Sequence, residues 1–230
     1  MTEFELRRRI VATARALVSR RLTSGRSGNV SARRRDGFVI TPSGMSYETM
    51  EAGDVVLLGP GGESHGSRRV PSTEWRLHAA LYRDRPDVHA VVHAHPVYAT
   101  ALACTGREIP PFHYMVAAAG GDSIPIAPYA TFGSEELAEL AAQTLRGRRA
   151  CLLAQHGVVA LGAAPAAALD LLDEVEWLAH QYWATLAVGG PSLLSGAEMA
   201  RVHERFKTYG QPRNERDAGG DDGPERGAPG

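Results

Sequence analysis

The sequence predicts a single α/β domain, in which short apolar strands alternate with amphipathic helices. A helix is expected over residues 3 to 22, because an apolar stripe at helical spacing begins with Phe4, Leu6 and Ile10 and has arginines opposite it. The almost wholly apolar runs “DVVLL” (54 to 58) and “ACLLA” (150 to 154) are typical of buried strands. We find no internal repeat and no second domain boundary.

The remaining elements follow from local patterns, in chain order. A Gly-rich loop leads to two strands joined by a turn at Asp36-Gly37. Ser72 or Thr73 is expected to cap a helix that runs to about Tyr82. Pro96 suits the first turn of another helix, which follows the strand “HAVVHAH”. Beyond it we expect a loop over 105 to 123, a strand near 123 to 127, a helix over 134 to 145, a strand–turn–strand over 150 to 162, and helices over about 165 to 188 and 197 to 206.

The composition changes sharply after Tyr209. The last 21 residues, “GQPRNERDAGGDDGPERGAPG”, contain no aromatic residue and no aliphatic residue larger than alanine. Such a segment has nothing to bury against a core. The sequence therefore predicts a folded domain over residues 1 to 210 and a disordered Gly/Pro/charged tail over 211 to 230.

Composition and charge exclude several classes of partner. The chain has 230 residues, 43% of them apolar and 22% charged, with a formal net charge of -1, as in ordinary soluble globular proteins. This balance gives no electrostatic reason to expect nucleic acid or an anionic membrane as a partner. The N-terminal residues lack the apolar core of a signal peptide, and no run approaches about 18 apolar residues. We expect a cytoplasmic protein.

The cysteines agree with a reducing compartment. Cys104 and Cys151 lie in the apolar stretches “ALACTG” and “RACLLA”. Two cysteines in such surroundings predict buried free thiols, because a disulfide framework uses more cysteines and belongs to oxidising compartments.

Two histidines mark a candidate metal site. His93 and His95 flank Ala94 at the end of an apolar run. On a strand, side chains two residues apart point to the same face, about 6.5 to 7 Å apart along the backbone. Both imidazoles can therefore reach one ion. The alternative is that one or both are hydrogen-bonded core histidines, which is the commoner role of an isolated His-x-His pair.

A third imidazole favours the metal. His156 follows a second buried strand and precedes Gly157, where the missing side chain permits close approach of another backbone. Catalytic zinc usually has three protein ligands and one open position. Two histidines from one strand and one from another would provide them.

Glu74 is a candidate base or fourth ligand. It lies at a predicted helix start, where a carboxylate is also common for purely electrostatic reasons. His78 shares its helix face and is a rival ligand, although a core position is the more frequent role for such a histidine.

Small residues in two loops can bind an anion. “SGRSGNVS” and “TPSG” offer backbone N–H groups and hydroxyls to phosphate oxygens, and the Asn29 amide adds a donor. Ser72 and Thr73, at a helix start, would form a third wall. Each loop taken alone is equally compatible with an ordinary turn.

Six segments, in this order, together resemble the class II aldolase/adducin family. They are “SGNVS”, “GFVITPSGMSYE”, “PSTEWRLHAALYRDRPDVHAVVHAHPVYATA”, “IPPFHYMVAAAGGDSIPIAPYATFGS”, “LLAQHGVVALG” and “RFKTYG”. The resemblance covers about residues 5 to 210. Among family members it is greatest to those that cleave L-fuculose 1-phosphate.

The resemblance implies a three-layer α/β/α sandwich with a mostly antiparallel central sheet. It also implies a homotetramer with active sites at subunit interfaces and one Zn²⁺ per subunit. The residues that match the family's metal ligands are Glu74, His93, His95 and His156. Those that match its phosphate site are Gly28, Asn29, Ser43, Gly44, Ser72 and Thr73.

The implied activity is reversible cleavage of a ketose 1-phosphate to dihydroxyacetone phosphate and an aldehyde such as L-lactaldehyde. Zinc would act as a Lewis acid on the developing negative charge. Glu74 would shuttle the C3 proton, and Tyr114 would accept the proton of the C4 hydroxyl. The residues that match aldehyde-side and transition-state groups, some of them supplied across a subunit interface, are Tyr114, Phe132, Phe206 and Tyr209.

Other substrates and activities stay open on this fold. The substrate can be 5-deoxyribulose 1-phosphate or 5-methylthioribulose 1-phosphate, which differ from L-fuculose 1-phosphate only beyond the cleaved bond. A sugar-phosphate epimerase would be expected to carry an acidic residue near “FHYMV”, where this chain has Tyr114. A dehydratase and a non-catalytic adducin-like module are the remaining alternatives. A Schiff-base mechanism is not expected, because Lys207 is the only lysine.

Overall fold

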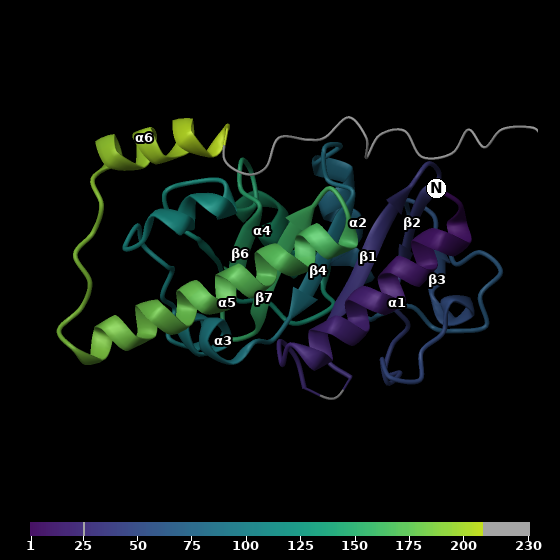
Figure 1. The fold of residues 1–230 in the computed structure, drawn as a ribbon. Helices are drawn as coiled ribbons and strands as arrows, with labels where there is room; N and C mark the ends of the chain where they lie inside the picture. Colours follow the sequence, from purple (N-terminus) through teal and green to yellow (C-terminus); the bar gives the residue numbers. More distant parts are fainter. Residues whose placement is uncertain (25, 209–230) are drawn as a thin grey trace, which may run out of the picture.

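Seven strands form one mixed sheet in the order β3-β2-β1-β4-β7-β6-β5. They belong to a computed structural model that describes residues 1–24 and 26–208 (Figure 1). The strands are β1 (Asn29–Arg34), β2 (Gly37–Ile40), β3 (Val56–Leu58), β4 (Ala90–Ala94), β5 (Ile126–Ala127), β6 (Ala150–Leu153) and β7 (Gly157–Gly162). The helices are α1 (Glu3–Ser19), α2 (Trp75–Asp84), α3 (Val97–Cys104), α4 (Glu135–Thr144), α5 (Pro165–Ala187) and α6 (Gly196–Phe206), with short 3-10 helices η1 (Ala52–Asp54) and η2 (Tyr114–Ala119).

The sheet is mostly antiparallel, as predicted. Among the described strands only the β5–β6 pair is parallel, and the five other pairings are antiparallel. β4 lies in the middle, between β1 and β7, with Asn29 and Val159 as the residues opposite His93. The central strand of the sheet therefore carries a predicted metal ligand.

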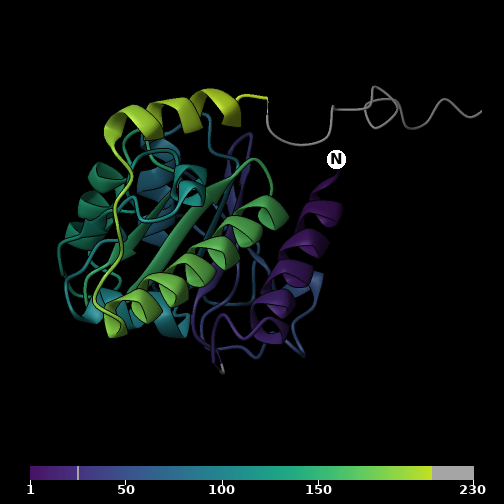
Figure 2. The same ribbon diagram turned by 60° about the vertical axis from the view of Figure 1, so that its left-hand side comes forward.

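Helices pack against both faces of the sheet (Figures 1 and 2). Successive side chains of a strand point to opposite faces. On β4, Ala90, Val92 and Ala94 belong to one apolar cluster and Val91 to another. The first cluster includes side chains of α1, α3 and α5, and the second those of α2 and α4. The predicted α/β class is confirmed. α2, which begins directly after Glu74, covers the face of the sheet to which Val91 points.

Two helix boundaries differ from the prediction. α1 ends at Ser19 rather than residue 22, because Arg21 adopts a left-handed backbone conformation (φ 59°) that turns Leu22 back into the core. α2 begins at Trp75, one or two residues later than predicted, with Glu74 rather than Ser72 or Thr73 as its N-cap. The Ser72 hydroxyl accepts a hydrogen bond from the Glu74 backbone N–H, so a turn precedes the helix.

Two further predictions need correction. His95 lies one residue beyond the end of β4 rather than within the strand. Both cysteines are free, but only Cys151 is buried; Cys104 is exposed at the end of α3. The predicted tail and Tyr209 lie outside the described residues. Within residues 1–24 and 26–208, none of the helices combines the length and apolar character that a bilayer span requires.

Packing of α1 provides a test of the fold. Ile10 is fully buried in the cluster shared with α3 and α5, whereas the neighbouring Arg9 is exposed. We expect Ile10→Ala to lower the free energy of unfolding by about 2 to 5 kcal/mol, through lost burial and a residual cavity. Arg9→Ala is the matched control and should change it by less than about 0.5 kcal/mol. Urea unfolding at one protein concentration measures both, and equal losses would contradict this packing.

Candidate metal centre and active-site cavity

Three imidazoles meet at the end of the central strand. The ring centroid of His93 lies 4.7 Å from that of His95 and 4.8 Å from that of His156. One potential ligand atom from each histidine lies within 4.8 Å of the others. His93 comes from β4, His95 from the residue after it, and His156 from the turn between β6 and β7. The predicted convergence of these histidines is confirmed.

The Glu74 carboxylate lies against the same cluster. Its Oε2 is 3.2 Å from His93 Nε2, and its Oε1 is 3.2 Å from His156 Nε2. The residue is only 7% exposed. Glu74 is the N-cap residue of α2, but its side chain makes no hydrogen bond to the backbone of that helix. Glu74 is therefore directed at the histidines instead of at its own helix.

Buried polar atoms without partners test whether this cluster fits a metal ion. Glu74 Oε1, His93 Nε2 and His95 Nε2 are all buried and make no hydrogen bond. Each such atom costs about 1 to 3 kcal/mol if nothing binds it. His93 Nδ1 donates to the Val158 carbonyl at 2.9 Å, which leaves the Nε2 lone pair facing the cluster. Nitrogen and carboxylate lone pairs gathered at one point fit a divalent metal such as zinc.

The pKa shifts of Glu74 and His95 favour the protonation states that bind metal, whereas, despite burial, the nearby Glu74 carboxylate raises the pKa of His93. Burial raises the pKa of Glu74, but His93 and His156 outweigh it and hold the pKa well below its usual range. Burial, with His93 and His156 nearby, lowers the pKa of His95 to about 3. At neutral pH the cluster thus offers an ionised carboxylate and a neutral imidazole, which are the ligand forms of these groups.

The predicted phosphate residues line the same cavity as the cluster. This cavity has a volume of about 400 Å³. The residues predicted for the site that line it are Gly28, Asn29, Ser43, Gly44, Ser72, Thr73, Glu74, His95, Phe132 and His156. Segments distant in sequence are thereby brought together, with polar groups beside the imidazoles. Their individual roles stay predictions.

Two glycines permit this close assembly. A Cβ at Gly28 (φ +81°) would lie 2.6 Å from the His93 carbonyl oxygen. A Cβ at Gly157 would lie 2.5 Å from the Ala94 carbonyl oxygen and 2.6 Å from His95 Cδ2. The predicted close backbone approach at Gly157 is confirmed, and it occurs against a candidate ligand.

Other predicted residues lie elsewhere in this chain. Tyr114, in η2, is 46% exposed, and Phe206, in α6, packs against a small cluster of Ala117, Met199 and Val202. The residues lining the cavity include Phe132 but neither of these two. Tyr209 is outside the described residues. Roles for these side chains stay predictions that involve a neighbouring subunit.

Sequence reasoning missed Arg26. Its side chain lines the cavity, and its Nη1 donates to the Gly44 carbonyl at 3.0 Å. The clue lay in “SGRSGNVS”, where the only cation of a loop proposed for phosphate is this arginine. Tyr129 and Gln155 also line the cavity. His78, the rival ligand, is fully buried and hydrogen-bonded to Ser31 and Asn29, as expected of a core histidine.

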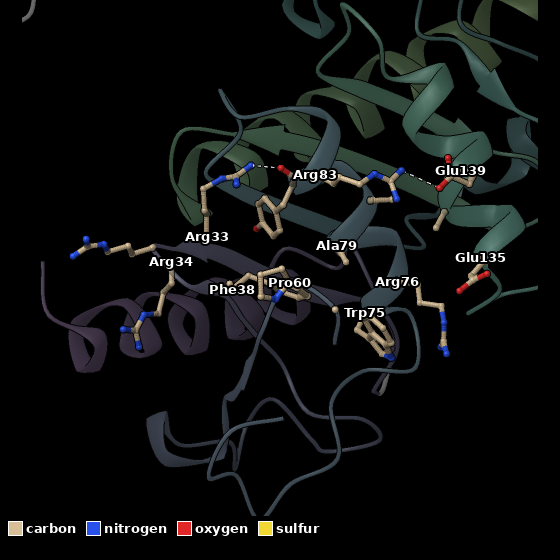
Figure 3. A pocket seen from close by; sticks show the side chains of 16 residues that line it. Arg33, Arg34, Phe38, Pro60, Trp75, Arg76, Ala79, Arg83, Glu135 and Glu139 are labelled. Atoms are coloured by element: carbon tan, nitrogen blue, oxygen red, sulfur yellow. Dashed lines mark hydrogen bonds and ion pairs between the residues drawn. The ribbon is translucent and has the colours of Figure 1, made fainter. Parts of the chain in front are cut away.

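A larger cavity of about 770 Å³ lies on the α2 and α4 side, away from the histidines (Figure 3). Several arginines line it, and three of those nearest α2 have partners. Arg33 donates to the Tyr82 and Val88 carbonyls, Arg83 to Glu139, and Arg76 lies over the Trp75 ring. Since these cations are already paired or stacked, we place the functional site at the smaller cavity.

Comparisons with known proteins agree with this site. The family model for the “Class II Aldolase and Adducin N-terminal domain” matches residues 8–183. The chain belongs to this family. A 5-methylthioribulose-1-phosphate/5-deoxyribulose-1-phosphate aldolase of Rhodospirillum rubrum is 49% identical over 205 residues, which is 89% of this chain and 92% of the relative. An L-fuculose phosphate aldolase of Escherichia coli K12 is 47% identical over 211 residues, 91% and 98% of the two chains.

A solved structure shows the same fold. An L-fuculose 1-phosphate aldolase superposes with a TM-score of 0.85 at 38% identity, covering 88% of this chain and 96% of that chain. Membership in the class II aldolase family confirms the predicted enzyme class, an aldolase-type lyase. The family is metal-dependent, and the histidine cluster of this chain can hold a metal ion.

The contact at Gly157 yields a prediction for this site. We expect Gly157→Ala to weaken metal binding, because the new methyl group would push against the Ala94 carbonyl and the His95 ring. Gly53→Ala is the matched control, since nothing lies within 4 Å of a Cβ there. Metal content after dialysis against limiting zinc measures the effect. Full zinc occupancy in Gly157→Ala would contradict the proposed geometry.

Proposed function

We propose that this chain catalyses reversible retro-aldol cleavage of a ketose 1-phosphate to dihydroxyacetone phosphate and an aldehyde. One observation carries the proposal: a single cavity combines the metal-binding cluster with six polar or glycine residues suited to phosphate. In this proposal the reacting carbons of the substrate lie beside the histidines, and its phosphate group lies beside the polar and glycine residues. Family membership agrees with the reaction class.

We propose zinc, one ion per subunit, held by His93, His95, His156 and, without substrate, Glu74. A bound zinc ion would supply Lewis acidity, which stabilises the negative charge that develops as the C3–C4 bond breaks. Buried atoms of Glu74, His93 and His95 that make no hydrogen bond, and the position of His156 beside them, support this ligand set. The Nδ1–H bond from His93 to Val158 would keep its ring oriented throughout the reaction.

Proton transfers in the proposed reaction fall to two side chains. Tyr114, from a neighbouring subunit, takes the proton of the C4 hydroxyl while the C3–C4 electron pair stays on the three-carbon fragment. In cleavage, a Glu74 that has taken up a proton from solvent delivers it to C3 and is left ionised; in condensation the ionised carboxylate removes a proton from C3. The position of Glu74, ionised and lining the cavity, supports its role as this base.

Phosphate binding would anchor the non-reacting end of the substrate. In the proposal, backbone N–H groups near Gly28 and Gly44 and the hydroxyls of Ser43, Ser72 and Thr73 hold the phosphate oxygens. We add Arg26 to this set, because a cation beside the two glycine turns complements the dianion. Fixing this end positions the reacting carbons at the metal side.

The assembly belongs to the same proposal. We infer a three-layer α/β/α domain over residues 1 to 210, which the clusters against both sheet faces support. We further propose a cytoplasmic homotetramer in which Tyr114, Phe132, Phe206 and Tyr209 act as aldehyde-side or transition-state groups, some of them supplied across subunit interfaces. The exposure of Tyr114 supports a role toward a neighbour, whereas Phe132 lines the cavity of its own chain.

L-Fuculose 1-phosphate is the substrate we propose, with 5-deoxyribulose and 5-methylthioribulose 1-phosphates as the second candidates. The 49% identity to the Rhodospirillum rubrum enzyme favours the second pair, against 47% to the Escherichia coli enzyme. The three substrates differ beyond C4, where one methyl or hydroxyl changes discrimination by only about 1 to 3 kcal/mol.

A panel of aldehydes tests both the reaction and the substrate. Purified protein would receive dihydroxyacetone phosphate with L-lactaldehyde, acetaldehyde or methylthioacetaldehyde, and kcat/KM would be compared. We expect the highest value with L-lactaldehyde, complete loss on chelation, and recovery with zinc. His95→Ala should lose bound zinc and activity, while His65→Ala, an exposed loop histidine, should keep both. A preference for methylthioacetaldehyde would select the second candidates. No condensation with any aldehyde would leave epimerase, dehydratase or non-catalytic functions.

Glu74 can be tested apart from the substrate question. We expect Glu74→Gln to lower the rate of C3 proton exchange in dihydroxyacetone phosphate by about 10² to 10⁴-fold, because the amide cannot take the proton. Deuterium incorporation followed by NMR measures this step. Glu136→Gln, an exposed glutamate in the first turn of α4, is the control. Wild-type exchange in Glu74→Gln would assign the base elsewhere.

A further inference from the structure

A buried chain of hydrogen bonds leads from Glu74 away from the metal cluster. Asn29 Nδ2 lies 2.9 Å from Glu74 Oε2, and Asn29 Oδ1 is bonded to His78 Nε2. His78 Nδ1 lies 2.6 Å from Ser31 Oγ, which lies 2.7 Å from the Tyr82 hydroxyl. Asn29, Ser31, His78 and Tyr82 are all less than 10% exposed. The chain of bonds therefore has no competition from solvent.

The contact between Asn29 and Glu74 decides the direction of the first two bonds. Asn29 Nδ2 donates to Glu74 Oε2, so the carbonyl oxygen of Asn29 faces His78. That oxygen only accepts. His78 must therefore carry its proton on Nε2 and donate it to Asn29.

The remaining bonds follow by the same elimination. Burial and the nearby His93 lower the pKa of His78 to about 3, so the ring is neutral and has one N–H. With the proton on Nε2, Nδ1 accepts, and Ser31 donates its single hydroxyl proton to it. The Tyr82 hydroxyl then donates to Ser31. Every bond in the chain points toward the carboxylate.

Tyr82 ends the hydrogen-bond chain farthest from Glu74, and it is held in place at the larger cavity. The Tyr82 ring lines the larger cavity, where the Arg33 guanidinium lies 4.8 Å from its centroid. Arg33 also donates to the carbonyls of Tyr82 and Val88 at 2.7 Å. The Phe38 ring packs on the Tyr82 ring, with 5.3 Å between the ring centroids. Tyr82 is thus held by neighbours that do not touch the metal cluster.

We propose that His78, Ser31 and Tyr82 are positioning residues, which act through Asn29 to fix the orientation of the Glu74 carboxylate at the metal centre. This orientation gives the two carboxylate oxygens of Glu74 different roles. Oε2 is held by Asn29, whereas Oε1 has no hydrogen bond and is available to a metal ion or a proton. If the Asn29 amide turned over, its carbonyl would face the carboxylate and repel it. Because His78 can donate only to an oxygen at that place, the chain opposes this flip.

The proposal depends on the metal centre of the proposed function but not on aldol chemistry. Its tests therefore use metal affinity and the histidine tautomer, which can be measured whether or not the protein cleaves a ketose 1-phosphate. If no aldehyde reacted but the metal affinity and the His78 tautomer changed as expected, the proposed reaction would be rejected and the proposed positioning role would stand.

The first test is the tautomer of His78. In the zinc-loaded full chain with ¹⁵N-labelled histidine, we expect long-range ¹H–¹⁵N spectra to show His78 neutral, with its proton on Nε2. Comparison with His78→Gln assigns the resonance. A proton on Nδ1 would turn the bond with Ser31 around and remove the donor to Asn29, and a charged ring would turn the bond with Ser31 around; either result would overturn the proposal. This readout needs no destabilising substitution in the molecule under study.

The second test compares two replacements of His78. The amide nitrogen of Gln reaches the position of Nε2 and can still donate to Asn29, whereas Asn is too short and reaches only the Nδ1 position. We expect His78→Asn to weaken zinc binding about 10- to 100-fold, as loss of an outer hydrogen-bond partner does. His78→Gln should stay close to wild type. Competition with a chromophoric chelator measures both affinities, and equal losses would contradict a donor role.

A milder variant covers the case in which His78→Asn fails to fold. Tyr82→Phe removes only the hydroxyl that starts the chain, and we expect weaker zinc binding together with a mixed His78 tautomer. Tyr182→Phe, at another buried tyrosine in the α5 core, is the matched control and should change neither. If Tyr82→Phe left both the affinity and the tautomer unchanged, Tyr82 and Ser31 would be excluded as positioning residues.

Discussion

The site depends on the gathering of unprotonated lone pairs at one buried point. Glu74 Oε1, His93 Nε2 and His95 Nε2 face each other without hydrogen-bond partners, an arrangement that costs free energy unless a cation satisfies it. The sheet is what enforces the meeting. His93 lies on the central strand, opposite Asn29 of β1 and Val159 of β7. A slip of one residue in either pairing would turn these side chains to the other face.

Residue types and spacings predict much of this metal centre. A prediction succeeds where the residues of a pattern together match one kind of site, and fails where several structures accept the same residues. The His-x-His pair alone is at least as common in protein cores, but together with His156 before Gly157 it matches the ligand count of a metal site, so the convergence could be anticipated before any coordinates. The boundary of α2 could not, because Ser72, Thr73 and Glu74 are all acceptable helix-capping residues and only the folded turn selects one.

Other features were missed because they consist of ordinary residues in particular places. Ser31 and Tyr82 are common in strands and helices, and only the packing of β1 on α2 makes them consecutive members of one hydrogen-bond chain. Arg26 stood within a loop already proposed for phosphate, but its choice of Gly44 as a partner is a tertiary contact. The exposure of Cys104 likewise depends on which side of α3 packs against the core.

The backbone setting of each ligand indicates which of them can move. His93, His95 and His156 sit in the central strand, directly after it, or in a tight strand-to-strand turn, where ladder hydrogen bonds fix the chain. Glu74 instead joins a turn to α2, and its side chain is not used to cap that helix. A rotation about its side-chain bonds would break no element of secondary structure. In the proposed reaction the three histidines can thus stay in place while the Glu74 carboxylate changes partner, and the cost of that change is the hydrogen bond from Asn29.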